Sequence, residues 1–282
     1  MRKISAFIKL TILLAGLSAL FIVIGYYIGG EQGMYFAVIA SLIMNFVSYW
    51  FSDKIVIGMS GAREASWKEV GGLEKSVQKI CDDMNIPLPK LYIMETLQAN
   101  AFATGRNPKK GVVCLTTGIM HQLDRDQLLG VIAHELAHIK NYDILISSVA
   151  AVIVSAISSL QNLAFWFGFG GRDDEDRNPL VGLIVLITAP IVAMLLQFGI
   201  SRSREYEADY TAAKYTKKPE ALASALVAID SSVRSTPIGD VNQSMASLFI
   251  HSPFSSRGLM ELFSTHPLTE KRVERLMSIV LD

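Results

Sequence analysis

The residues best suited to chemistry lie together in the run His134-Glu135-Leu136-Ala137-His138, which is an H-E-x-x-H motif. Residues of an α-helix are about 100° apart around its axis, so His134 and His138 project from one stripe, about 40° apart. Two imidazoles so placed suit zinc, which keeps an open position for water. Glu135 can remove a proton from that water without binding the metal itself. The motif predicts a catalytic site for one Zn2+ per chain that still needs a further protein ligand.

The helix that positions this motif is well marked in the sequence. Asp124 is a suitable N-cap, Gln127 three residues later completes a capping box, and the helix continues to Lys140. Small residues flank the histidines on one side and apolar residues on the other: Gly130, Ala133 and Ala137, then Leu128, Leu129, Ile132, Leu136 and Ile139. The helix is therefore expected to be buried on nearly all faces. Burying two histidines and a glutamate there is costly without a metal or other polar partners.

A candidate for the missing ligand lies far downstream, just after the last apolar stretch. Glu205 and Asp209 are four residues apart and face the same side of a helix. If Glu205 binds zinc, Asp209 can accept the free ring N–H of a ligand histidine and fix its tautomer. Two alternatives stay open: ligation by Glu207, which would lack such a helper, or an ordinary charged helix with pairs such as Arg204 with Glu207. We expect Glu205 to be the ligand and Asp209 its helper.

Composition places much of the chain in a membrane. Hydrophobic residues make up 51% of the 282 residues and charged residues only 18%, against about 25% charged in a soluble domain. Apolar stretches long enough to cross a bilayer, which takes about 20 residues, lie at about 4–28, 34–51, 144–169 and 180–200. The first follows Arg2 and Lys3, but its apolar run is too long for a typical signal-peptide core and no clear small-x-small cleavage site interrupts it. We therefore expect an uncleaved anchor.

Basic residues orient these spans. They precede the first stretch and are frequent in the middle segment and the tail, whereas the short connections hold only Glu31 and the acidic run 172–177, read as a solvated loop. The positive-inside rule then places the N-terminus, middle segment and tail in the cytoplasm. The chain divides into 1–52 with two spans, 53–143 with the H-E-x-x-H helix, 144–200 as a transmembrane hairpin, and 201–282 with the further ligand. The hairpin would bring the two cytoplasmic parts of one site together.

The middle segment has an α/β pattern. A helix is expected over 73–84, followed by strands at Lys90–Met94, Asn100–Thr104 and Gly111–Thr116. Small residues alternate around an aromatic one in the second strand, at Asn100, Ala101, Phe102 and Ala103. This pattern suits an edge strand to which an extended substrate adds through main-chain hydrogen bonds. A purely structural strand is the alternative.

The remaining polar and irregular features receive simpler interpretations. His121 and His251 have no motif around them and are expected to be structural, and the separated Cys81 and Cys114 to be reduced thiols. Segment 235–264 contains Ser, Gly and Pro and is expected to be a lid or substrate loop. Its apolar cluster, residues 245–250, could touch lipid or substrate.

Together these motifs resemble the HtpX family of bacterial membrane metallopeptidases, relatives of the type I CAAX prenyl protease. The motifs that carry the resemblance occur in order: Asn-Ala-Phe-Ala-Thr-Gly at 100–105, His-Glu-Leu-Ala-His at 134–138 followed by Asn141 and Asp143, Glu-x-x-Ala-Asp at 205–209, and His266-Pro267 with Arg272. The fold expected is an α-helical membrane protein with four transmembrane helices and a cytoplasmic α+β zincin-like metalloprotease domain. The family implies a zinc-dependent endopeptidase with Glu205 as a ligand.

The resemblance also implies a biological setting. It indicates removal of damaged or misassembled proteins in the bacterial inner (cytoplasmic) membrane, with a multi-pass chain whose active site faces the cytoplasm. Its partners would be membrane lipids and membrane or unfolded protein substrates. His266 and Arg272 are expected to stabilise the oxyanion or position the substrate, although His266 could instead cap the helix over 269–280. Asn141 and Asp143 are expected to shape the junction between the motif helix and the third span.

Other classes of protein fit the sequence less well. A narrow-specificity CAAX-type processing protease would have a larger helical chamber than four spans can build. A zinc carrier would place polar residues in the central thirds of its spans, which here have almost none. A third alternative is an inactive scaffold that keeps the metal for stability. The net charge of zero gives no general attraction for nucleic acid, and no oligomeric state is predicted.

Overall fold

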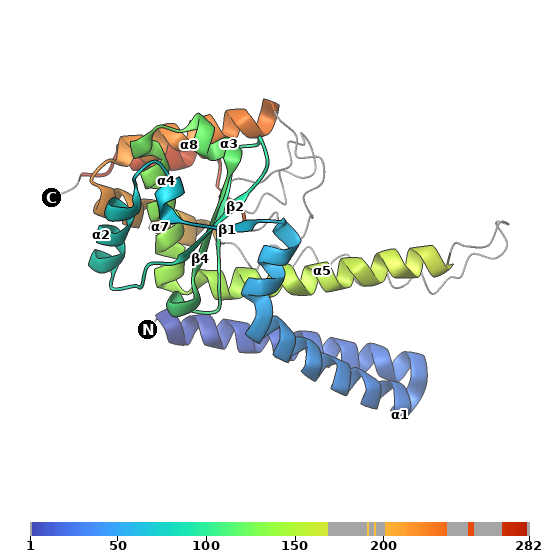
Figure 1. Ribbon diagram of the computed structural model, residues 1–282. Coiled ribbons are helices and arrows are strands. Elements are labelled where there is room, and N and C mark those ends of the chain that lie inside the picture. The colour runs from blue at the N-terminus through green and yellow to red at the C-terminus, as the bar shows by residue number, and fades with distance from the viewer. Residues whose placement is uncertain are drawn as a thin grey trace.

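The computed structural model describes residues 2–168, 191, 195, 201–235, 248–250 and 267–280. Long helices extend to one side of an α/β part that contains the sheet (Figure 1). The first of them, α1 (Arg2–Ser60), is two helices joined at Gly29 and Gly30. In the part of the chain described, Lys3–Tyr27 and Gly29–Ser60 are each long and apolar enough to cross a membrane. These helices contain the first two predicted spans.

The second of these helices is longer than the sequence pattern predicts. The connection left between the first two predicted spans, residues 29–33, shrinks to a break at Gly29 and Gly30, where Gly30 has a φ of 58° and a ψ of −144° that only glycine adopts easily. The two helices then pack very closely, because a Cβ added at Gly33 would lie 2.1 Å from the carbonyl oxygen of Gly25. Beyond position 51 the helix continues to Ser60, so the boundary expected at 52 falls inside α1.

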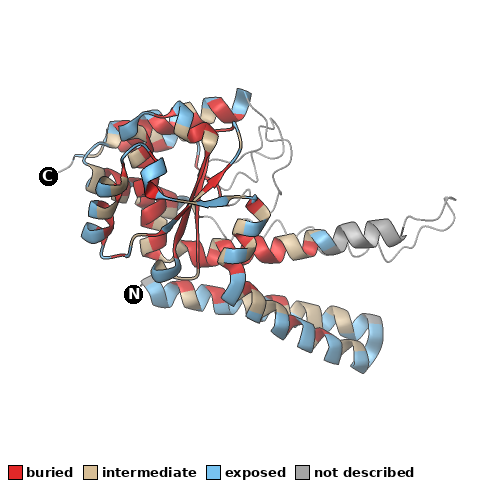
Figure 2. Ribbon diagram, viewed as in Figure 1, coloured by how far each residue is buried: buried red, intermediate tan, exposed pale blue. Residues whose placement is uncertain are grey.

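The surface of α1 is suited to lipid. Exposed residues occur along both of its halves (Figure 2). Large apolar side chains are among them, including Ile4, Ile8, Phe36, Leu42 and Phe46. Such a continuous apolar surface is not stable in water. The opposite side of α1 packs against α5 (Asp143–Gly168), which covers the third predicted span. The buried cluster between them joins Leu10, Leu13 and Leu17 to Leu145, Val149 and Ile153.

The fourth predicted span, 180–200, lies outside the described residues except for two positions. Ile191 and Leu195 are helical, buried, and part of the cluster formed by α1 and α5. Four residues apart, they lie on one face of a helix. At these two positions the chain therefore packs against α1 and α5, as expected of a neighbouring span.

Among the described residues, four strands form a sheet that is the frame of the α/β part. Its strands are β1 (Arg63–Ala65), β2 (Lys90–Met94), β3 (Ala101–Thr104) and β4 (Val112–Thr116), in the order β1-β2-β4-β3. β2 and β4 are parallel, and the other neighbouring pairs are antiparallel. The three predicted strands are present with their ends moved by at most one residue. β1 was not predicted, because three residues are too few to show an alternating pattern. β3 is an edge strand.

Helices cover this sheet and position the site. They are α2 (Glu74–Met84), α3 (Thr117–Gln122), α4 (Arg125–Asn141), α7 (Arg202–Thr216), α8 (Pro219–Ser235) and α9 (Thr269–Met277), with short 3-10 turns at Trp67–Glu69 and Pro108–Lys110. α4 is the central element, because it contacts α7, α8, α2 and the strands β3 and β4. α3 and α8 were not predicted.

The ends of α4 have clear local causes. Asp124 accepts hydrogen bonds from the backbone N–H groups of Asp126 and Gln127, both at 2.9 Å, and the Gln127 side chain accepts from the Asp124 N–H at 3.0 Å. The predicted capping box is therefore present. The helix ends at Tyr142, which has a left-handed φ of 65°. α5 starts at the next residue, at 88° to α4, so Asp143 returns toward the last turn of α4.

Candidate metal centre

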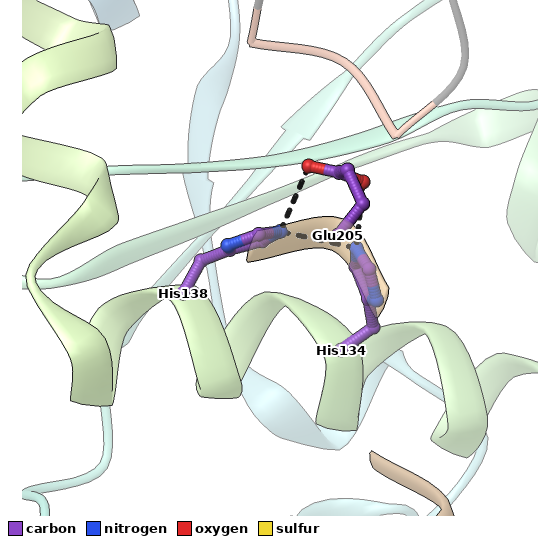
Figure 3. Close-up of side chains that lie close together, drawn as sticks. All are labelled: His134, His138 and Glu205. Atoms are coloured by element: carbon purple, nitrogen blue, oxygen red, sulfur yellow. Dashed lines mark hydrogen bonds and ion pairs between the residues drawn. The ribbon is translucent and has the colours of Figure 1, made fainter. Parts of the chain in front are cut away.

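Three side chains predicted to bind metal converge in the structure. His134 and His138 project from one face of α4, and Glu205 reaches them from the first turn of α7 (Figure 3). The two Nε2 atoms are 3.1 Å apart. Glu205 places Oε2 at 3.6 Å from the first of these nitrogens and Oε1 at 3.5 Å from the second. One ligand atom from each of the three residues lies within 4.8 Å of the others, so they can share a single ion.

Each imidazole is held from behind by a carboxylate. His134 Nδ1 lies 3.0 Å from Asp209 Oδ1, the contact expected from the helical spacing of Glu205 and Asp209. His138 Nδ1 lies 3.1 Å from Asp143 Oδ2. This second partner was predicted only as a junction residue. Its sequence signal is weak, since it lies five positions after the histidine and only the bend after α4 brings it back.

The donor set fits zinc. When each Nδ1–H donates to its carboxylate, each Nε2 carries a lone pair. Two such lone pairs and the carboxylate of Glu205 then face one another, which is unfavourable unless a positive charge lies between them. Burial alone would lower the pKa of His134, but the carboxylates of Asp209 and Glu205, which accept hydrogen bonds from its ring, outweigh this effect and raise the pKa to about 9. The site therefore favours a cation, and nitrogen and oxygen donors in this number suit Zn2+.

Glu135 occupies the position expected of a base. It follows the first histidine on α4, is buried, and lines the same pocket as His134 and His138. Burial raises the pKa of its carboxyl group, although the two nearby histidines oppose this shift. A carboxylate with a raised pKa accepts a proton more readily near neutral pH. Glu135 can thus exchange a proton beside the metal site.

Arg272 reaches the site from α9 and contacts the carboxylates. Its Nε and Nη2 donate to the two carboxylate oxygens of Asp209 at 2.9 and 2.7 Å. Its Nη1 lies 3.6 Å from Glu205 Oε2 and donates to the backbone oxygen of Ile250 at 3.2 Å. This bidentate pair is buried, so Arg272 holds Asp209 in place against His134. These contacts favour a role in positioning Asp209 over the predicted stabilisation of an oxyanion by Arg272.

The predicted substrate strand borders the site. Ala103 of β3 lines the pocket together with the histidines, and α4 packs against β3. Asn100 precedes the strand, and its side chain accepts a hydrogen bond from the Ala101 N–H at 3.0 Å. Phe102 is buried. His266, His251, the acidic loop 172–177 and most of segment 235–264 lie outside the described residues.

Comparisons with known proteins identify relatives of this chain. Residues 68–280 match peptidase family M48. "Protease HtpX homolog" from Pyrococcus furiosus is 48% identical over 99% of this chain and 98% of its own length. The protein of the same description from Thermococcus sibiricus is 50% identical over 95% and 94%, and that from Methylibium petroleiphilum 44% over 96% and 97%.

A solved structure shares the fold at lower similarity. The crystal structure of S. mikatae Ste24p is 19% identical, with a TM-score of 0.50, and the similarity covers 98% of this chain but only 66% of that one. This likeness concerns the fold alone. The sequence relatives cover nearly the full length and contain no large unmatched part, so the resemblance noted in the sequence is confirmed. The chain belongs to peptidase family M48 and is a membrane metalloprotease of the HtpX type.

Proposed function

We propose that the protein is a zinc-dependent endopeptidase that binds one Zn2+ through His134, His138 and Glu205 and uses Glu135 as its base. The observation that carries this proposal is the 3.1 Å approach of the two histidine Nε2 atoms, with the Glu205 carboxylate beside both. Family membership supports the choice of peptide bonds as the substrate.

The residues divide the work of hydrolysis. When bound, zinc polarises the peptide carbonyl and makes a water more acidic. Glu135 removes a proton from the attacking water, whose oxygen forms a bond to the carbonyl carbon. The C–N bond of the peptide then breaks, and Glu135 returns the proton to the leaving amine. Asp209 and Asp143 keep the imidazoles oriented throughout, and Arg272 keeps Asp209 in place.

The membrane setting is part of the proposal. We place the third and fourth spans at about 144–169 and 180–200 in a bacterial inner membrane. Domains 53–143 and 201–282 then lie on its cytoplasmic side. Three observations support this: the charge distribution, the α5 helix that leaves the site directly after α4, and the packing of α5 on α1. A site at the cytoplasmic end of a transmembrane span suits the removal of damaged membrane proteins. Unfolded segments of such proteins would be its substrates.

A cleavage assay tests the proposal against its alternatives. Detergent-purified protein should cleave casein, a zinc chelator should stop the cleavage, and Glu135→Gln should keep zinc but lose at least about 100-fold in rate. Glu220→Gln, an exposed acid on α8, is the matched control and should cleave normally. Cleavage at the native rate by Glu135→Gln would refute the assignment of the base. A folded, zinc-loaded wild type that cleaves nothing would favour a carrier or a scaffold, and cleavage restricted to one short motif would favour the CAAX-type alternative.

A further inference from the structure

The outer edge of β3 is occupied by a short segment from the second half of the chain. On its inner side β3 pairs with β4 over Ala101–Thr104. On its outer side the N–H of Ile250 donates to the carbonyl oxygen of Ala101 at 2.9 Å, and Phe102 forms an antiparallel bridge with Phe249. Residues 248–250 therefore lie where an added strand would lie.

Side chains fix this segment in place. The rings of Phe102 and Phe249 meet edge to face, with centroids 5.3 Å apart and an interplanar angle of 81°. Both rings are fully buried, and Leu248 is nearly so. Arg272 donates to the carbonyl oxygen of Ile250 at 3.2 Å. The segment is thus bound by an aromatic contact, a backbone hydrogen bond and a charged donor that also serves the metal site.

The segment also faces the chemistry. Leu248, Phe249 and Ile250 line the same pocket as His134 and Glu135. An extended substrate that adds to β3 would use the carbonyl oxygen of Ala101, which already accepts from Ile250. Its side chain beside Phe102 would meet the ring of Phe249. The segment and such a substrate cannot both occupy this edge.

We propose that Leu248-Phe249-Ile250 occupies the substrate position as an internal pseudosubstrate, and that a substrate binds by replacing it. This inference rests on the proposed peptidase function and names the class of its substrate: extended apolar segments with an aromatic side chain packed against Phe102 and aliphatic neighbours on both sides. Such sequences are buried in folded proteins. The site would therefore select segments that unfolding has exposed and leave folded neighbours uncut.

The strength of the contact suits an occupant that can leave. Within residues 248–250, the part of it that the structure describes, the segment forms one isolated bridge, whereas β3 and β4 pair along four residues. A longer peptide can pair with more of β3, and it can supply its own aromatic ring to Phe102. The apparent affinity for such a peptide equals its intrinsic affinity multiplied by the fraction of molecules in which the segment has left the edge. Loosening the segment should therefore strengthen peptide binding.

Peptide binding to a catalytically silent protein tests this directly. The probe is a fluorescein-labelled peptide that copies residues 244–253, and its binding to zinc-loaded Glu135→Gln is followed by fluorescence anisotropy. Adding Phe249→Ala should tighten binding about tenfold, because the occupied fraction falls. Val227→Ala, an exposed position on α8, is the matched control and should change nothing. A probe with Asp in place of its Phe should bind at least about tenfold more weakly. Unchanged or weaker binding by the Phe249→Ala protein would mean that the segment is a permanent wall of the site, and the proposal would be overturned.

Hydrogen exchange gives a second answer that needs no variant in the segment. In Glu135→Gln alone, the amide of Ile250 is protected by its bond to Ala101. Saturating peptide should remove this protection while β4 stays protected; retained protection would contradict displacement. Neither measurement depends on turnover. A failure of the casein assay would therefore count against the peptidase function, whereas a failure here would count only against the pseudosubstrate.

Discussion

The two histidines of the proposed metal site are supported in different ways. His134 is almost fully enclosed, with 1% of its side chain exposed, and its partner Asp209 is clamped by the bidentate Arg272 at 2.7 and 2.9 Å. His138 is 15% exposed, as is its partner Asp143, whose contact with Arg204 is a longer 3.4 Å. In both cases a histidine contacts an aspartate, which contacts an arginine. We call His134, Asp209 and Arg272 the buried arm, and His138, Asp143 and Arg204 the partly exposed arm.

The difference separates two tasks. The buried arm joins α4, α7 and α9, so it contributes to stability as well as to ligand orientation. The partly exposed arm joins the end of α4 to the first residue of α5, the helix that packs on α1. It orients a ligand at the junction between the α/β part and the long helices. A buried ion pair is costly to break, whereas a more exposed one contributes little to stability.

The largest effect is expected from Asp209→Ala. This change leaves the buried Arg272 without its main partner and His134 without its support. We expect a loss of about 3–5 kcal/mol in the free energy of unfolding and a zinc affinity reduced by about 10–100-fold. Denaturant unfolding in detergent and zinc titration measure the two quantities. A variant as stable as the wild type would show that the clamp does not carry the stability of this arm.

Asp143→Ala should separate the two quantities. Zinc affinity should again fall by about 10–100-fold, because His138 loses the partner of its Nδ1. Stability should change by no more than about 1 kcal/mol, because the pair is partly exposed. The same two measurements apply. Equal destabilisation by Asp143→Ala and Asp209→Ala would remove the distinction between the arms.

Arg204→Gln should have the smallest effect. Its contact with Asp143 is long and partly exposed, so we expect a loss of about 1 kcal/mol or less in stability and full zinc occupancy. Arg272→Gln, the matched change in the buried arm, should be far more damaging. If the two arginine variants behave alike in unfolding and zinc titration, burial does not determine how much each arm contributes to stability and zinc affinity.

Local pattern predicted the parts of the site that lie within one helix. The stripe of His134 and His138, the base beside them, and the shared face of Glu205 and Asp209 all follow from helical spacing, and the capping box fixed where α4 starts. The strands of the sheet, except the three-residue β1, were predicted from short apolar runs bounded by turn-forming residues. Features that depend on how helices and strands pack against one another could not be predicted from the sequence.

Three examples show what the sequence could not supply. The contact of Asp143 with His138 depends on the 88° bend after Tyr142. The role of Arg272 depends on α9 packing beside α7. The pairing of Phe249 with Phe102 joins positions that are far apart in the sequence, although the sequence pattern indicates both the edge strand and the apolar cluster that contains Phe249. Tertiary packing decides each of these.

Zinc content is the most direct test of the central claim, that two imidazoles of α4 and one carboxylate of α7 hold a single ion. Elemental analysis should find about one zinc per chain in purified wild type, and almost none in Glu205→Ala, because one of three ligands is lost. Glu207→Ala, the neighbouring acid on the same helix, should keep its zinc. Zinc retained by Glu205→Ala, or lost from Glu207→Ala instead, would contradict the assigned site.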